Sequence, residues 1–421
     1  MTLNSPVDLS EGDSNLSPNR EAWISTLDTK TRELLERDSD VFLHQSLSTP
    51  CINALKGCGN ARLTDLSGRT FLDFHGNSVH QAGFSHPKIV DAIWKQMNAL
   101  SFCTRRYTCE KAVELAERLV ALAPGSLGKV LFAPGATSSV GMALKLARVA
   151  TGRHKTVSMW DSFHGASLDA ISIGGESLFR KNMGPLLPGT EHVPPPEPYR
   201  CLFDDTGDCE RCGLKCARYI DYVLDREQDV AAVVAEPVRC TYIVPPPPGF
   251  WKAVRQSCDR RGTLLIFDET AVCLGRTGTM FAFENYDVIP DMVVIGKGLG
   301  GGIMPFSALI ANKDLDLAPD RALGHYTHEK NPVACAAALA TIDVIEENNL
   351  PGQSRTLGRH AMDRMNEMKS RYEIIGDVRG QGLMFGAELV TNRQTREPAL
   401  DQADRIMYRC LELGLSFKVS K

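Results

Sequence analysis

Three apolar stretches of the sequence end in ionisable side chains. Glu236 follows VAAVVA, Asp268 follows TLLIF, and Lys297 follows MVVIG and precedes a run that is mostly glycine. Ligands bind just outside the carboxyl ends of the strands in an open parallel sheet. Apolar surroundings disfavour the charged form of a lysine, which makes its amine a better nucleophile and base. These positions therefore predict a reactive centre at one edge of a buried sheet.

Two further loops follow strand-like stretches and add binding groups. The loop after KVLFAP opens a helical pattern with small residues, namely Gly135, Ala136, Thr137 and Ser138. Backbone N–H groups at the start of such a helix are free to hold a phosphate. The loop after KTVSMW carries Phe163 and His164, which supply an aromatic face and an imidazole.

Together these groups match the outline of pyridoxal 5′-phosphate. The loop of small residues can hold the phosphate, Phe163 can stack on the ring, Asp268 can hold the pyridine proton, and Lys297 can bond to the aldehyde. His164 and Glu236 are expected beside the cofactor, although Glu236 is equally well explained as an acceptor for a backbone amide. The glycines after Lys297 let the backbone approach closely and leave the amine room to move.

The order of the elements indicates an α/β protein. From KVLFAP onward, continuous apolar runs alternate with helical periodicity, which is typical of a mostly parallel sheet covered on both faces. We expect residues 91–335 to form this large cofactor-binding domain. Residues 1–90 supply an N-terminal segment and part of a smaller α+β domain, which residues 336–421 complete. The first forty or so residues are polar and expected to be mostly irregular, apart from a helix near TRELLERD.

Composition excludes several classes of function. The 421 residues carry a formal net charge of −4 without a basic run, so nucleic-acid binding has no electrostatic support. No apolar run approaches the roughly 20 residues of a membrane span. The polar start, MTLNSPVDLSEGDSNLSPNR, lacks the apolar segment of an export signal. Thirteen cysteines in such a chain indicate reduced thiols and a cytoplasmic location.

The chain resembles the subgroup III aminotransferases, pyridoxal-phosphate enzymes of fold type I. The shared strings run from about Asp73 to the C-terminus and are ALKLAR, FHG, AEPV, IFDE, GRTG, PDMVVIGKGLGGG, NPVACAAALA and VRGQGLMFGAEL. The resemblance implies that Lys297 is the covalent lysine and Asp268 the partner of the pyridine nitrogen. It also implies that Thr327, in HYTHEKNP, reaches the cofactor phosphate of a partner subunit, so that a homodimer has its sites at the subunit interface.

The sequence departs from this family at the site itself. Ser138 stands where the family usually has glutamate. The string Asp268-Glu269-Thr270-Ala271 replaces Asp-Glu-Val-Gln, which removes the glutamine that meets the cofactor's ring hydroxyl. Ordinary transaminase chemistry is therefore in question. The family also usually continues beyond LSFKVSK, so the C-terminal domain is expected to be incomplete.

Within the family, FHGNSVHQAGF, CTRRYT, GHYTHEK and a cysteine-bearing insert resemble ammonia-lyases that act on hydroxylated aminophosphonates. A phosphonate dianion needs basic partners. The candidates, about half of which are expected to be structural, are Arg105, Arg106, Arg239, His328 and Lys330. Three alternatives stay open: a lyase for an aminophosphonate, an ω-aminotransferase that needs a keto-acid acceptor, and a non-catalytic binding protein.

The insert CLFDDTGDCERCGLKC raises the question of a metal site. Cys209, Cys212 and Cys216 have a metal-like spacing, and Cys201 is a possible fourth ligand. The second half of the insert falls within a helical pattern, and the expected chemistry needs no metal. We therefore favour free thiols in a surface insert and no metal ion.

Overall fold

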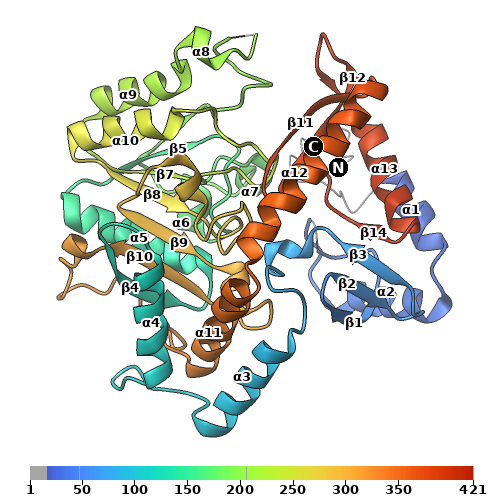
Figure 1. Ribbon diagram of the computed structural model, residues 1–421, viewed down its shortest axis with the longest axis horizontal. Helices are drawn as coiled ribbons and strands as arrows, with labels where there is room; N and C mark the ends of the chain where they lie inside the picture. Colours follow the sequence, from blue (N-terminus) through green and yellow to red (C-terminus); the bar gives the residue numbers. More distant parts are fainter. Residues whose placement is uncertain (1–16, 47, 205, 421) are drawn as a thin grey trace.

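The computed structural model describes residues 17–46, 48–204 and 206–420, so the start examined for an export signal lies largely outside the described residues (Figure 1). Within that part, the largest sheet has the strand order β4-β10-β9-β8-β7-β5-β6. Its strands are β4 (Leu127–Ala133), β5 (Lys155–Met159), β6 (Thr190–Val193), β7 (Val230–Ala235), β8 (Leu264–Asp268), β9 (Met292–Ile295) and β10 (Ser307–Asn312). Strand β10 is antiparallel to β4 and β9, and the remaining pairs are parallel. The expected α/β fold with a mostly parallel sheet is confirmed.

Helices cover both faces of this sheet, which explains why its strands are apolar throughout. One face packs on α4 (Glu110–Leu122), α9 (Lys215–Glu227), α10 (Phe250–Arg261) and α11 (Pro332–Glu347), and the other on α5 (Ala136–Thr151) and α6 (Leu168–Ile173). Consecutive strand residues alternate between the two cores: Val233 lies in the first and Val234 in the second. Burying one such side chain contributes about 1.5–3 kcal/mol.

Smaller sheets combine the two ends of the chain. Strands β1 (Leu55–Gly59), β2 (Arg62–Asp65), β3 (Thr70–Asp73) and β14 (Leu415–Ser416) form one sheet, in which β14 is parallel to β3. Strands β11 (Ile375–Gln381), β12 (Met384–Asn392) and β13 (Glu397–Pro398) form another, flanked by α12 (Leu350–Arg371) and α13 (Leu400–Glu412). N- and C-terminal segments thus share a sheet, while the boundaries at residues 90 and 335 stay predictions.

The polar N-terminal segment is more helical than its composition suggested. Helix α1 (Pro18–Ser25) precedes α2 (Thr29–Val41) and lies beside α13 (Figure 1). It begins there because the Ser17 hydroxyl accepts the Arg20 N–H at 3.1 Å. Trp23 anchors the helix, since its ring is buried and its Nε1 donates to Ile52 O at 2.8 Å.

The remaining helices are short or connect the domains. They are α3 (Pro87–Ala99), α7 (Ser177–Arg180), α8 (Cys209–Cys212) and the 3₁₀ turns η1 (Gly76–Ser78), η2 (Ala282–Tyr286), η3 (Lys297–Gly300) and η4 (Lys313–Leu315). Over the described residues, none of the helices is both long enough and apolar enough to cross a bilayer.

Candidate active site

Lys297 lies directly beyond β9 in an unusual backbone conformation. Its φ is +45°, in the left-handed region, and it opens the turn η3. A non-glycine residue held in this region costs about 1–3 kcal/mol, and such strain is concentrated at functional sites. Within the described part of the chain, no hydrogen bond or ion pair is formed by its amine. The amine is therefore available for covalent bonding and proton transfer.

The glycines on either side of Lys297 permit two close approaches. A Cβ on Gly296 would lie 3.1 Å from the Ala136 Cβ, so the end of β9 abuts the phosphate loop. A Cβ on Gly298 would overlap the side-chain amide of Gln81. Both polar atoms of that amide are buried without a hydrogen-bond partner among the described residues. Gln81 is a site residue that sequence reasoning missed, because nothing in its own segment places it beside the lysine.

Asp268, at the end of β8, is held as a carboxylate. Its Oδ2 lies 2.9 Å from His164 Nδ1, and its Oδ1 accepts the Thr270 N–H at 3.1 Å and the Thr270 hydroxyl. Burial alone would raise the Asp268 pKa, but the hydrogen bond and charge of His164, aided by Thr270, hold it below its usual value. The same pairing overcomes burial and raises the His164 pKa. The anionic carboxylate suits a protonated pyridine nitrogen.

Glu236 supports the loops around the site. Its Oε1 accepts the Phe163 N–H at 3.1 Å, and its Oε2 accepts the Cys240 N–H at 3.0 Å. The sequence left two roles open for Glu236, a contact to the cofactor or an acceptor for a backbone amide. These two hydrogen bonds correspond to the second role. Phe163 is half-buried, and its ring centroid lies 4.4 Å from that of Phe179. Through these bonds Glu236 fixes where the aromatic face of Phe163 lies.

The phosphate loop has the open helix start that the sequence indicated. Helix α5 begins at Ala136, and Gly135 provides no side-chain cap. The Ser138 N–H already donates to Gly135 O at 3.0 Å, so the N–H groups of Ala136 and Thr137, which have no helical partner, are the ones left for an anion. Thr137 Oγ1 lies 2.8 Å from Ser167 Oγ, which joins this loop to the Phe163 segment. Gly165 has φ +121°, and a Cβ there would overlap Thr137, so glycine is required at this close approach.

The exposed basic candidates lie on two loops that meet. Arg105 and Arg106 follow α3. His328 and Lys330 precede α11, and Thr327 lies in the same loop as these two. All five side chains are exposed. Arg105 Nη2 lies 2.6 Å from Nε2 of His325, a residue that sequence reasoning had not singled out. Phe102 packs edge-on against His328 with ring centroids 5.3 Å apart.

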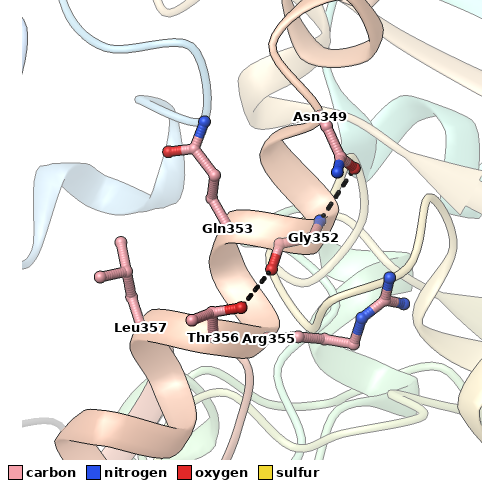
Figure 2. A pocket seen from close by; sticks show the side chains of 6 residues that line it. All are labelled: Asn349, Gly352, Gln353, Arg355, Thr356 and Leu357. Atoms are coloured by element: carbon pink, nitrogen blue, oxygen red, sulfur yellow. Dashed lines mark hydrogen bonds between the residues drawn. The ribbon is translucent and has the colours of Figure 1, made fainter.

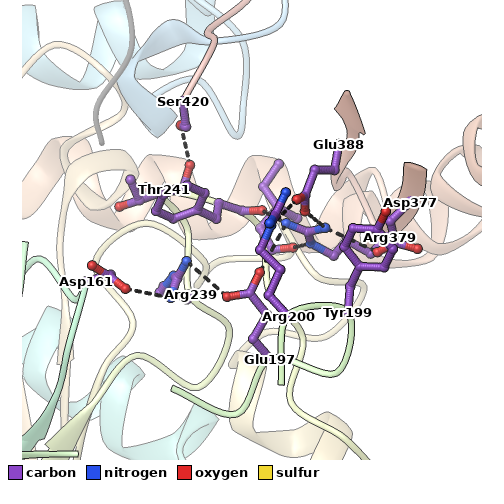
Figure 3. Close-up of polar contacts among 12 residues, drawn as sticks. Asp161, Glu197, Tyr199, Arg200, Arg239, Thr241, Asp377, Arg379, Glu388 and Ser420 are labelled. Carbon is purple, nitrogen blue, oxygen red and sulfur yellow. Dashed lines mark hydrogen bonds and ion pairs between the residues drawn. The ribbon is translucent and has the colours of Figure 1, made fainter. Parts of the chain in front are cut away.

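Arg239 lies instead in a buried network between the domains (Figure 3). Its Nη1 is 3.9 Å from Asp161 Oδ2, its Nη2 is 3.8 Å from Glu197 Oε2, and its Cζ is 4.4 Å from the Tyr242 ring centroid. Glu197 also faces Arg379 of β11, at 3.7 Å. The network connects the loop after β7 to the small domain, and Arg239 lines a small enclosed cavity together with Glu236 and Trp251.

The cysteine insert shows no arrangement for a metal. Cys209 and Cys212 lie in α8 and Cys216 in α9, and burial raises the Cys216 pKa to about 12. Across the ranges 17–46, 48–204 and 206–420, no group of three or more His, Cys, Asp or Glu residues is placed to hold a metal ion. Free thiols in this insert stay a prediction, and metal analysis of the purified protein is the measurement that checks it.

A separate open hollow lies on the N-terminal turns of α12 (Figure 2). Asn349 and Thr356 in its lining form bonds to Gly352, at 3.3 Å and 3.1 Å. None of the residues predicted for the site lines it. The expected site at the ends of the strands is therefore separate from this hollow.

Comparison with known proteins shows the family of the chain. The family model described as aminotransferase class-III matches residues 45–420. The chain belongs to this family. It is 46% identical over 425 residues to the (R)-1-hydroxy-2-aminoethylphosphonate ammonia-lyase of Vibrio splendidus, covering 98% of this chain and 89% of the relative. It is 36% identical over 395 residues to the leucine/methionine racemase of Thermococcus litoralis, covering 92% and 88%.

A solved structure extends the likeness. The taurine:2-oxoglutarate aminotransferase of Bifidobacterium kashiwanohense, solved with PLP and glutamate, superposes with a TM-score of 0.87 at 28% identity and covers 94% of this chain and 92% of that one. The fold-type-I architecture and membership in a family of pyridoxal-phosphate enzymes are confirmed. A non-catalytic protein, the third alternative, is set aside.

The residues present fit pyridoxal phosphate. The open N-terminus of α5 suits the phosphate, the anionic Asp268 suits the ring nitrogen, and the unpaired amine of Lys297 suits the aldehyde. The family's ring-hydroxyl glutamine is replaced by Ala271, which is buried. Its neighbour Thr270 instead holds Asp268 through both its N–H and its hydroxyl. The departure thus leaves Asp268, the expected partner of the ring nitrogen, held in place.

Proposed function

We propose that the chain is a pyridoxal-phosphate-dependent ammonia-lyase that converts (R)-1-hydroxy-2-aminoethylphosphonate to phosphonoacetaldehyde and ammonia. The single observation that carries the proposal is the 46% identity, across 98% of the chain, to a relative named for this activity. The site supports it, because an unpaired lysine amine and an anionic aspartate lie at adjacent strand ends.

The bonds broken in this reaction assign work to particular residues. When bound, pyridoxal phosphate supplies an aldehyde for the amine and an electron sink for the carbon that bears nitrogen. The amine of Lys297 removes the proton from that carbon as a general base. Asp268 keeps the ring nitrogen protonated, and Glu236 keeps Phe163 in place for stacking. The hydroxyl on the neighbouring carbon leaves as water, and hydrolysis of the released enamine takes up one water and yields ammonia.

We also propose a cytoplasmic homodimer with shared sites. Thr327 is exposed on the single chain, as a residue that reaches a partner must be. Helix α3 and the segment after it present large exposed apolar side chains, among them Trp94, Met97 and Tyr107. Such side chains favour burial against a second copy. A reducing compartment suits a chain whose thirteen cysteines are free thiols.

The second candidate function is an ω-aminotransferase. The structural likeness to transaminases favours it, because the same Lys297 and Asp268 serve both reactions. The two functions differ in whether an amino acceptor is needed. In the lyase reaction the nitrogen leaves as ammonia at every turnover, whereas a transaminase retains it until a keto acid arrives.

We expect many turnovers of ammonia release from (R)-1-hydroxy-2-aminoethylphosphonate with no keto acid present. The measurement is ammonia and phosphonoacetaldehyde against enzyme concentration, with 2-aminoethylphosphonate as the control because it lacks the leaving hydroxyl. Strict dependence on pyruvate or 2-oxoglutarate would replace the lyase with the transaminase.

A further inference from the structure

Two surface loops bring a group of basic side chains together without neutralising them. We call Arg105, Arg106, His325, His328 and Lys330 the basic cluster. Arg105 places both terminal nitrogens against both ring nitrogens of His325, with Nη2 at 2.6 Å from Nε2. Within residues 17–46, 48–204 and 206–420, no carboxylate forms an ion pair with any member. The nearby Glu329 carboxylate accepts the Tyr326 N–H at 3.3 Å.

The contact between Arg105 and His325 has more hydrogen-bond donors than acceptors. A guanidinium only donates, and a neutral imidazole carries hydrogen on one of its two nitrogens, so one of the two contacts sets donor against donor. Arg321, close by in sequence, is matched instead by Asp320, with which it pairs at 2.6 Å. An anion with several acceptor oxygens would satisfy the Arg105 and His325 donors together.

We propose that Arg105 and His325 bind the phosphonate group of the substrate, and that they do so in the partner subunit's site. The proposal rests on the proposed function and on the homodimer. Thr327, expected at the partner's cofactor phosphate, is two residues from His325 in the same loop. All members of the cluster are exposed on the single chain, whereas Asp268 and His164 are buried. A dianion beside Arg105 and His325 would supply the negative charge that no carboxylate of the described residues supplies to them.

The remaining basic candidate, Arg239, has a different environment. It is buried, faces Asp161 and Glu197, and stacks on Tyr242 (Figure 3). Two carboxylates already oppose its charge, so a dianion arriving there would meet their repulsion. Arg105 meets no such group among the described residues, and the substrate anion is therefore assigned to Arg105 and its partner His325.

The first test compares Arg105→Ala with Arg321→Ala, a matched exposed arginine that already has a carboxylate partner. With the aminophosphonate, Arg105→Ala should raise KM by about 10–100-fold, the effect of losing a hydrogen bond to a charged group, and kcat should change less. Arg321→Ala should behave as wild type. Equal effects of the two substitutions would overturn the assignment, since they would reflect the general positive potential.

The second test uses binding and is independent of turnover. Methylphosphonate is titrated into the holoenzyme by calorimetry, and Arg105→Ala should weaken its binding by the same factor. If wild type binds methylphosphonate but releases no ammonia from the substrate, the proposed reaction is wrong and the subsite still stands. If Arg105→Ala binds methylphosphonate as wild type does, the subsite is wrong whatever the reaction.

The third test asks which subunit supplies Arg105. Two differently tagged chains, Lys297→Ala and Arg105→Ala, are co-expressed and the hybrid dimer is purified. If Arg105 acts across the interface, the chain with Lys297 intact receives Arg105 from its partner, and the hybrid shows about half the wild-type rate at low substrate. A hybrid no faster than the Arg105→Ala homodimer would place Arg105 in its own subunit's site and overturn the assignment to the partner's.

Discussion

Replacing Lys297 with alanine is expected to abolish ammonia release. The amine lies just beyond the end of β9, beside the end of β8, and it forms no hydrogen bond or ion pair among the described residues. In the proposed reaction it is both the covalent attachment and the general base, so the loss should be about 10⁴-fold or more. The visible absorbance band of the holoenzyme should disappear together with activity. The measurements are the rate of ammonia release and the absorption spectrum.

Lys145→Ala is the matched control for this substitution. Lys145 lies on α5 in the same domain and is exposed. Its replacement should leave rate and spectrum unchanged, and far-ultraviolet circular dichroism should show that both variants are folded. Retention of the absorbance band in Lys297→Ala would contradict the assignment of the covalent lysine.

Replacing Asp268 with asparagine is expected to lower kcat by about 10²–10³-fold, because one preorganised electrostatic partner is lost. Asparagine keeps the size of the side chain but has no charge to hold a protonated ring nitrogen. The measurement is kcat with saturating cofactor, which separates this loss from weaker cofactor binding. Asp287→Asn is a suitable control, since that side chain is exposed and pairs with Lys252 at 3.1 Å.

His164 provides an independent check on Asp268. The pairing with His164 holds the Asp268 pKa below its usual value against the effect of burial. With the folded pKa below the unfolded one, the ionised carboxylate contributes stability above about pH 4, and this contribution is lost as the pH falls through the folded pKa. In His164→Ala, only the Thr270 hydrogen bonds still oppose the effect of burial, so the Asp268 pKa should rise and the acidic limb of the rate profile should move to higher pH. An unmoved acidic limb would mean that His164 does not tune this carboxyl.

The sequence predicted the strand ends well because burial and chemistry coincide there. Lys297 and Asp268 each interrupt an apolar run, and β7, β8 and β9 end at the expected points. Local chemistry also anticipated the open start of α5. The role of Glu236 could not be decided from the sequence. An isolated glutamate does not reveal that it accepts the N–H groups of Phe163 and Cys240. Helix α1 was missed because its stability comes from Trp23 and from contacts with α13.

Contacts between distant segments could not be predicted from the sequence. Arg105 and His325 are 220 positions apart, and neither segment has a pattern that names the other. Arg239 was a candidate partner of the substrate anion, yet it is buried and faces the carboxylates of Asp161 and Glu197. Gln81 reaches the lysine only because Gly298 leaves space for its amide. Each of these depends on tertiary packing rather than on local periodicity.

The central claim is that one strained, unpaired amine at the end of β9 bonds to the cofactor. Reduction of the holoenzyme with borohydride, followed by digestion and mass spectrometry, tests it most directly. The account predicts a single pyridoxyl label, on the peptide that contains Lys297. A label on another lysine, or a fully loaded enzyme that takes no label, would contradict it.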